Sequence, residues 1–155
     1  MHCDFETTTT QQKAEFIKLD HASLARKILA ENEILNDKIT ACLECDPELV
    51  PTALAEVIRF LSLISISDDI LTPSQRVDLA WHEFILCTRV YARFCDRQIG
   101  RFIHHSPGGS DDMNRHRFAK TLRLYQRYFG QPDTYFWGNT WRGPADPDCG
   151  ACEAV

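Results

Sequence analysis

The sequence lacks the features that mark secreted, membrane-spanning and nucleic-acid-binding proteins. No basic stretch followed by an apolar core stands at its start, so we expect no signal peptide. No apolar run approaches the ~18 residues that cross a bilayer. The formal net charge is −5 and there is no long basic run, which argues against nucleic acid and membrane as partners. We therefore expect a cytoplasmic protein whose partner is another protein or a small molecule.

Familiar catalytic motifs are also missing. The chain contains no glycine-rich phosphate loop, no H-E-x-x-H and no G-x-S-x-G. His82 and Glu83 begin like a zincin motif, but the second histidine is absent. No strand-like alternation of apolar and polar residues and no internal repeat is present. These absences leave open whether the protein is an enzyme. They predict an almost entirely helical chain, which a sheet of three or more strands would refute.

Helix caps and helical apolar stripes are what the chain does contain. Stripes with a period of 3.6 residues predict helices over residues 21–34, 36–45, 47–65 and 73–100, the last with a bend near Thr88. A final helix runs to Phe129 and ends at Gly130. We predict an all-α bundle of about four to five helices with the 73–100 helix at its centre. The expected N-caps are Asp20, Asp46 before Pro47, Thr72 before Pro73, and Asp111 or Asp112.

The length of 155 residues suits one domain. We expect a flexible N-terminus over residues 1–12, a helical domain over 13–132 and an irregular tail over 133–155. The tail contains Tyr135, Phe136, Trp137 and Trp141, and so many aromatic residues favour packing back onto the bundle.

Residues 76–105 hold three of the six histidines in a mostly apolar segment. Asp78 and His82 are four residues apart and share one helix face. His104 and His105 follow Gly100, a natural helix stop. Histidines on a helix and on its exit loop can converge on a metal ion or on a substrate.

Three parts of this segment carry a family resemblance: residues 77–82 (Val-Asp-Leu-Ala-Trp-His), 89–95 (Arg-Val-Tyr-Ala-Arg-Phe-Cys) and 100–105 (Gly-Arg-Phe-Ile-His-His). They resemble the family called glycine-rich domain-containing protein-like, a helical domain of plant glycine-rich proteins and short bacterial proteins. The similarity covers residues 71–107, and more loosely the preceding helix from residue 63. Phe84 stands where plant members often have a second histidine, and the glycine-rich tail is absent. The resemblance implies a helical fold and no particular activity.

A zinc-type metal site is the sharpest hypothesis for this segment. His82 and one of His104 and His105 supply imidazoles, but two imidazoles are too few for stable zinc. Cys149 and Cys152 form a C-x-x-C whose spacing suits chelation, and they would complete a set of four ligands. Four protein ligands would make the site structural, whereas three ligands with water would make it catalytic.

Four further residues are expected around this site. Asp78 would hold one ring nitrogen of His82, as carboxylates do beside metal-bound histidines. Trp81 and Tyr91 should be buried, with Trp81 packed on the helix over residues 47–65. We expect the thiol of Cys95 to lie beside the same pocket.

Two alternatives to a metal site remain open. In the first, the Trp81–His82 pair and the loop histidines are core residues of a protein-interaction module, and the terminal cysteines are idle. In the second, a metal-independent enzyme uses His82 as its base, with Cys95 or Asp78 beside it.

Other cysteines and a row of arginines favour ordinary structural roles. Seven cysteines without a secretion signal suggest a reducing compartment, with free thiols in place of disulfides. Cys42 and Cys45 fall near the end of a helix, where a redox C-x-x-C is not expected, so they are interpreted as structural. A zinc site made from both C-x-x-C pairs is a weaker alternative. The four arginines, spaced four residues apart, should form a solvated helix face: Arg89, Arg93, Arg97 and Arg101.

Overall fold

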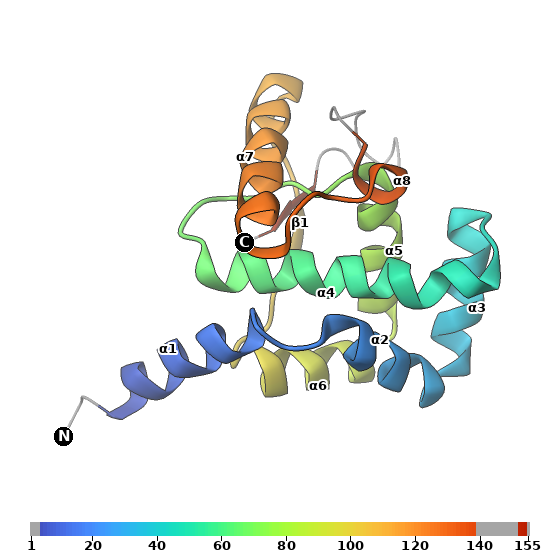
Figure 1. The fold of residues 1–155 in the computed structure, drawn as a ribbon, viewed down its shortest axis with the longest axis horizontal. Coiled ribbons are helices and arrows are strands. Elements are labelled where there is room, and N and C mark those ends of the chain that lie inside the picture. The colour runs from blue at the N-terminus through green and yellow to red at the C-terminus, as the bar shows by residue number, and fades with distance from the viewer. Residues whose placement is uncertain (1–3, 139–151, 155) are drawn as a thin grey trace.

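The computed structural model describes residues 4–138 and 152–154, and helices dominate it (Figure 1). Helices account for 73% of the structure, so the predicted all-α class is confirmed, with eight helices in place of four or five. The α-helices are α1 (Asp4–Phe16), α2 (His21–Ala30), α3 (Glu33–Leu43), α4 (Val50–Ile66), α5 (Gln75–Leu86), α6 (Thr88–Gln98), α7 (Asp111–Phe129) and α8 (Thr134–Trp137). A 3-10 turn, η1 (Pro47–Leu49), leads into α4, and two strands, β1 (His105–Pro107) and β2 (Cys152–Ala154), complete the described elements.

The centre of the fold is α4, and not the 73–100 segment as predicted. In Figure 1, α4 runs across the middle of the molecule, with α1, α2 and α6 on one side and α7 and α8 on the other. Leu54, Val57, Ile58 and Leu61 are fully buried, and even Glu56 is 2% exposed. A helix buried nearly all round takes the central position because its apolar surface must be covered on every side.

The apolar composition of α4 corrects the expectation that no segment is long and apolar enough to span a membrane. The segment Pro47–Ile66 is long and apolar enough to cross a membrane by length and composition alone. However, 72% of its apolar window is buried inside the protein, as befits a core helix.

Two of the predicted N-caps, Asp20 and Asp46, are confirmed. Asp20 accepts a hydrogen bond from the amide of Ser23, and Asp46 accepts one from Glu48. By contrast, α5 is capped by Ser74, not Thr72. The hydroxyl of the buried Thr72 instead donates to Asn114 Oδ1 of α7. Ser110, one residue before the predicted position, caps α7.

Two predicted helices are each divided in the structure. The 21–34 helix ends at Ala30, and the side-chain amide of Asn32 donates to the carbonyl oxygen of Ile28. The 73–100 helix breaks at Cys87, with φ −79° and ψ 62°, close to the bend expected near Thr88. Helix α1 covers most of residues 1–12, which were expected to be a flexible N-terminus, and continues to Phe16. The side chain of Phe16 is buried.

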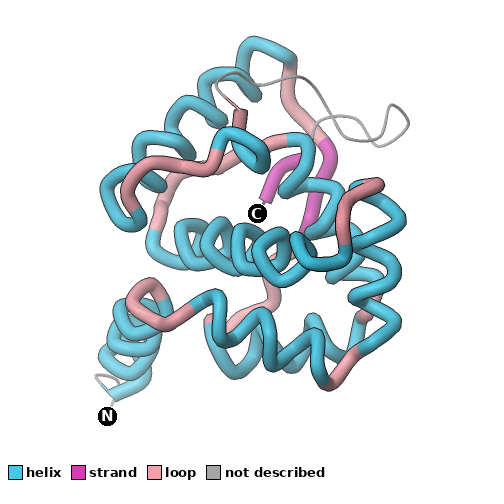
Figure 2. Tube along the Cα trace, turned by 45° about the vertical axis from the view of Figure 1, so that its right-hand side comes forward, coloured by secondary structure: helices cyan, strands magenta, loops and turns pink. Residues whose placement is uncertain are grey.

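The two short strands, which the sequence did not indicate, pair antiparallel (Figure 2). His105 stands opposite Ala154, and Pro107 stands opposite Cys152. The C-terminal strand therefore lies beside the segment that carries the loop histidines.

Candidate metal centre

Three polar side chains from two elements converge beside the core. Asp78 and His82 come from successive turns of α5, and His105 comes from β1. One ligand atom from each lies within 4.8 Å of the other two. Among the described residues, this is the group of three acidic, histidine or cysteine side chains that could hold a metal ion.

The carboxylate of Asp78 pairs with the ring of His105, whereas the sequence predicted that it would hold His82. His105 Nε2 lies 2.8 Å from Asp78 Oδ1, and both side chains are nearly buried, at 6% and 7% exposure. His82 Nδ1 lies 2.9 Å from the main-chain oxygen of Asp78 and 3.7 Å from Oδ2. A carbonyl oxygen can only accept, so Nδ1 of His82 carries the proton in this bond. Its Nε2 is then the ring nitrogen that bears the lone pair.

Aromatic packing fixes the ring of His105. Its centroid lies 4.3 Å from that of Trp81 and 4.1 Å from that of His82. The indole N–H of Trp81 donates to the hydroxyl of Tyr91, which donates to the carbonyl oxygen of Ile103. This chain of hydrogen bonds holds the backbone two residues before His105 against α5. Trp81 and Tyr91 are fully buried, as predicted, and Trp81 packs on Phe60 of α4, at 5.5 Å between ring centroids.

The remaining predicted site residues lie elsewhere or outside the described structure. His104 is exposed, packs its ring on Phe102 at 4.7 Å between centroids, and does not belong to the group around Asp78. Cys149 lies outside the described residues. The backbone of Cys152 pairs with Pro107 in β2, and its side chain lies outside the description.

Burial raises the pKa of two other cysteine thiols, Cys95 and Cys42. Cys95 is fully buried, and burial raises the pKa of its thiol. A thiol held neutral is a poor nucleophile, which disfavours a Cys95–His82 catalytic pair. Burial likewise raises the pKa of Cys42 to about 11. Both Cys42 and Cys45 are free thiols.

The predicted solvated helix face holds three of the four arginines, because α6 ends at Gln98 and Arg101 lies beyond it. Arg89, Arg93, Arg97 and Arg101 are all exposed.

Two imidazoles and one carboxylate are a donor set that divalent transition metals accept. Three protein ligands leave coordination positions open, in contrast to a closed structural site. The sequence indicated the histidines but assigned Asp78 a supporting role, because the spacing of four residues pointed to His82. No sequence pattern indicated that Asp78 pairs with His105, because that contact joins residues 27 positions apart.

Comparison with known proteins places the chain in a family. The model of the family described as UCP032817-like matches residues 20–130, so the chain belongs to the UCP032817-like family. This family has no established function. No curated protein and no solved structure matches the chain.

The family match corrects the resemblance inferred from the sequence. The assignment to the glycine-rich domain-containing protein-like family was wrong. It rested on a motif within residues 71–107, whereas the match extends over residues 20–130 and spans α2 to α7. Much of that motif packs the core, with Trp81 and Tyr91 fully buried, and packing residues alone do not identify a family.

Proposed function

We propose that the protein binds a divalent metal ion of the zinc type through Asp78, His82 and His105. The convergence of three donor atoms within 4.8 Å carries this proposal. Asp78 and His105 are buried together, and a buried carboxylate needs a cation, a proton or hydrogen bonds to compensate for lost hydration. A metal ion would supply that compensation.

The distances suit an ion after small side-chain movements. Ligand atoms about 2.0–2.1 Å from a tetrahedral ion lie roughly 3.3 Å from one another. Asp78 and His105 are already 2.8 Å apart, so the ion would replace the hydrogen between them. The bond from His82 Nδ1 to a main-chain oxygen is also the arrangement that orients metal-bound histidines and leaves Nε2 as the ligand.

The proposal includes a role for the terminal C-x-x-C. Cys149 and Cys152 would supply thiolates to the same ion in place of Asp78, so that two histidines and two cysteines make the four ligands of a structural site. The backbone of Cys152 pairs two residues from His105. With these thiolates the site would be closed and structural. With Asp78 and the two histidines alone it would be open to water or a substrate. A reducing compartment such as the cytoplasm, where we propose that the protein resides, would keep the thiols unoxidised.

Elemental analysis of untagged protein tests the metal and its ligands together. We expect about one zinc per chain in the wild type, and loss of most of it in His105→Ala and His82→Ala. The matched control is His104→Ala, which removes the neighbouring exposed imidazole and should retain the metal.

The Cys149→Ser/Cys152→Ser double variant separates the two forms of the site. Loss of metal would favour the closed site, and retention would favour the open one. Absence of metal from the wild type, even after incubation with zinc, would contradict the proposal and favour the metal-free interaction module.

A further inference from the structure

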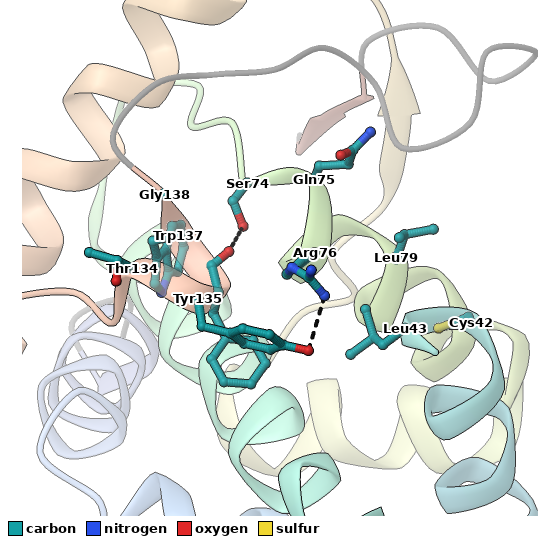
Figure 3. A pocket seen from close by; sticks show the side chains of 11 residues that line it. Cys42, Leu43, Ser74, Gln75, Arg76, Leu79, Thr134, Tyr135, Trp137 and Gly138 are labelled. Atoms are coloured by element: carbon teal, nitrogen blue, oxygen red, sulfur yellow. Dashed lines mark hydrogen bonds between the residues drawn. The ribbon is translucent and has the colours of Figure 1, made fainter. Parts of the chain in front are cut away.

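A cavity of about 450 Å³ opens beside the first turn of α5 (Figure 3). Its walls come from the end of α3, the start of α5 and the short helix α8. None of its lining residues belongs to the group of Asp78, His82 and His105. It is therefore a separate site, and the argument about it does not depend on the metal.

Among the described residues that line this cavity, Arg76 is the single charged side chain. No aspartate or glutamate is among its described lining residues, although the whole chain carries a net charge of −5. Cys42 also lines the cavity, and with a pKa raised to about 11 its thiol is uncharged at neutral pH. The cavity thus has a local positive charge in an acidic protein.

The guanidinium of Arg76 is held in place without being neutralised. Its carbon lies 4.2 Å from the ring centroid of Tyr135, and Nη1 donates to the Tyr135 hydroxyl at 3.1 Å. Figure 3 shows this pair among the lining side chains, joined by the dashed line. Within the described part of the chain, Arg76 makes no ion pair. A guanidinium has five N–H donors, so one bond to a phenol leaves donors for a bidentate contact with an acid group.

The other walls indicate what the rest of a ligand would be. Leu43 and Leu79 present apolar surface to the cavity. Ser74 is occupied, since its hydroxyl donates to the carbonyl oxygen of Phe136 and accepts from the amide of Val77. Apolar surface together with a preorganised arginine suits a ligand with one acid group on a small apolar body.

We propose that this cavity binds a small organic anion, and that Arg76 holds its carboxylate or phosphate group. Tyr135 is the positioning residue, because it stacks on the guanidinium and fixes its direction.

Titration with matched probes tests the proposal on the full chain, with and without a chelator. The probes are benzoate and phenyl phosphate, which share a ring and differ in their acid group, and benzamide, a neutral counterpart of benzoate. We expect at least one anion to bind, and benzamide to bind about tenfold more weakly or worse.

Three variants assign the binding to the cavity. Arg76→Gln should weaken the anion about tenfold or more, because it removes a charge-assisted contact. Arg89→Gln, which removes an exposed arginine of α6, should leave binding unchanged. Tyr135→Phe keeps the ring and should weaken binding less than Arg76→Gln. The thermal midpoint of each variant reports whether it is folded.

Preference between the two anions identifies the acid group. Equal binding to wild type and a folded Arg76→Gln would overturn the proposal. Benzamide binding as tightly as benzoate, or no anion bound at millimolar concentration, would overturn it as well. Retention of anion binding in chelator-treated protein would show that this site stands even if the metal site fails.

Discussion

At the scale of single residues, Trp81 joins the candidate metal centre to the core. One side of the indole packs on Phe60 of α4, and the ring also lies 4.3 Å from that of His105. Its N–H donates to Tyr91. A single side chain therefore contributes to core packing and to the orientation of a candidate ligand.

Truncation of Trp81 should be strongly destabilising. Trp81→Ala removes a fully buried aromatic side chain, so the free energy of unfolding should fall by about 3–5 kcal/mol. Urea denaturation followed by circular dichroism measures this change. Substitution of the exposed Phe102 by alanine is the control and should cost much less. An unchanged urea midpoint for Trp81→Ala would show that the indole does not pack as described.

At the scale of elements, Ser74 connects two helices through one hydroxyl. It accepts from the amide of Val77 as the cap of α5, and it donates to the carbonyl oxygen of Phe136 in α8. Ser110 caps α7 in the same way by accepting from Met113, and no second bond of its hydroxyl is described. The two serines can therefore be compared: Ser110 only caps its helix, whereas Ser74 caps its helix and also bonds to another one.

Replacement of each serine by alanine should measure the extra bond. Ser110→Ala should lower the free energy of unfolding by about 1 kcal/mol, the usual cost of losing a cap. Ser74→Ala should cost about 1 kcal/mol more, because it also leaves the Phe136 carbonyl without its donor. Equal losses in chemical denaturation would mean that the bond between α5 and α8 contributes nothing.

His21 ties α2 to α1 and α7. It is 4% exposed, its Nε2 donates to the carbonyl oxygen of Phe16, and its ring meets the edges of Phe16 and Phe129. Burial lowers the pKa of His21 from its usual 6.5, and this effect outweighs the hydrogen bond to Phe16, which raises it. The folded protein thus favours the neutral ring.

Stability should therefore decline on acidification because of His21. Between the unfolded pKa of 6.5 and the lower folded pKa, the unfolded chain binds more protons, so the contribution is present above pH 6.5 and is lost as pH falls. His21→Phe should reduce the slope of unfolding free energy against pH below 6.5, while His116→Gln, at an exposed position of α7, should not. A slope that is identical in His21→Phe and wild type would refute this role.

At the scale of the whole molecule, the helical class was predictable and the polar contacts between helices were not. Caps and apolar stripes are local, so Asp20 and Asp46 could be assigned from neighbouring residues. The cap of α5 is Ser74, while the hydroxyl of Thr72 donates to Asn114, which is distant in the sequence. Residue types alone could not show which hydroxyl was needed elsewhere.

Glu56 shows the same limit inside the core. From the sequence it interrupts an apolar stripe, yet its buried carboxylate accepts from Tyr125 and from the indole N–H of Trp137, and pairs with Arg59. This group joins α4, α7 and α8. Such contacts depend on how the elements pack, and so does the meeting of Asp78 with His105 at the candidate metal centre.

The location of zinc in crystals of zinc-loaded protein tests the central claim most directly. Anomalous difference maps from data collected on both sides of the zinc absorption edge identify the ion without relying on its surroundings. The account predicts one strong peak about 2.0–2.1 Å from a ring nitrogen of His82 and of His105, and about 2.0–2.2 Å from a carboxylate oxygen of Asp78. No peak at these three side chains, or a peak only at other residues, would contradict it.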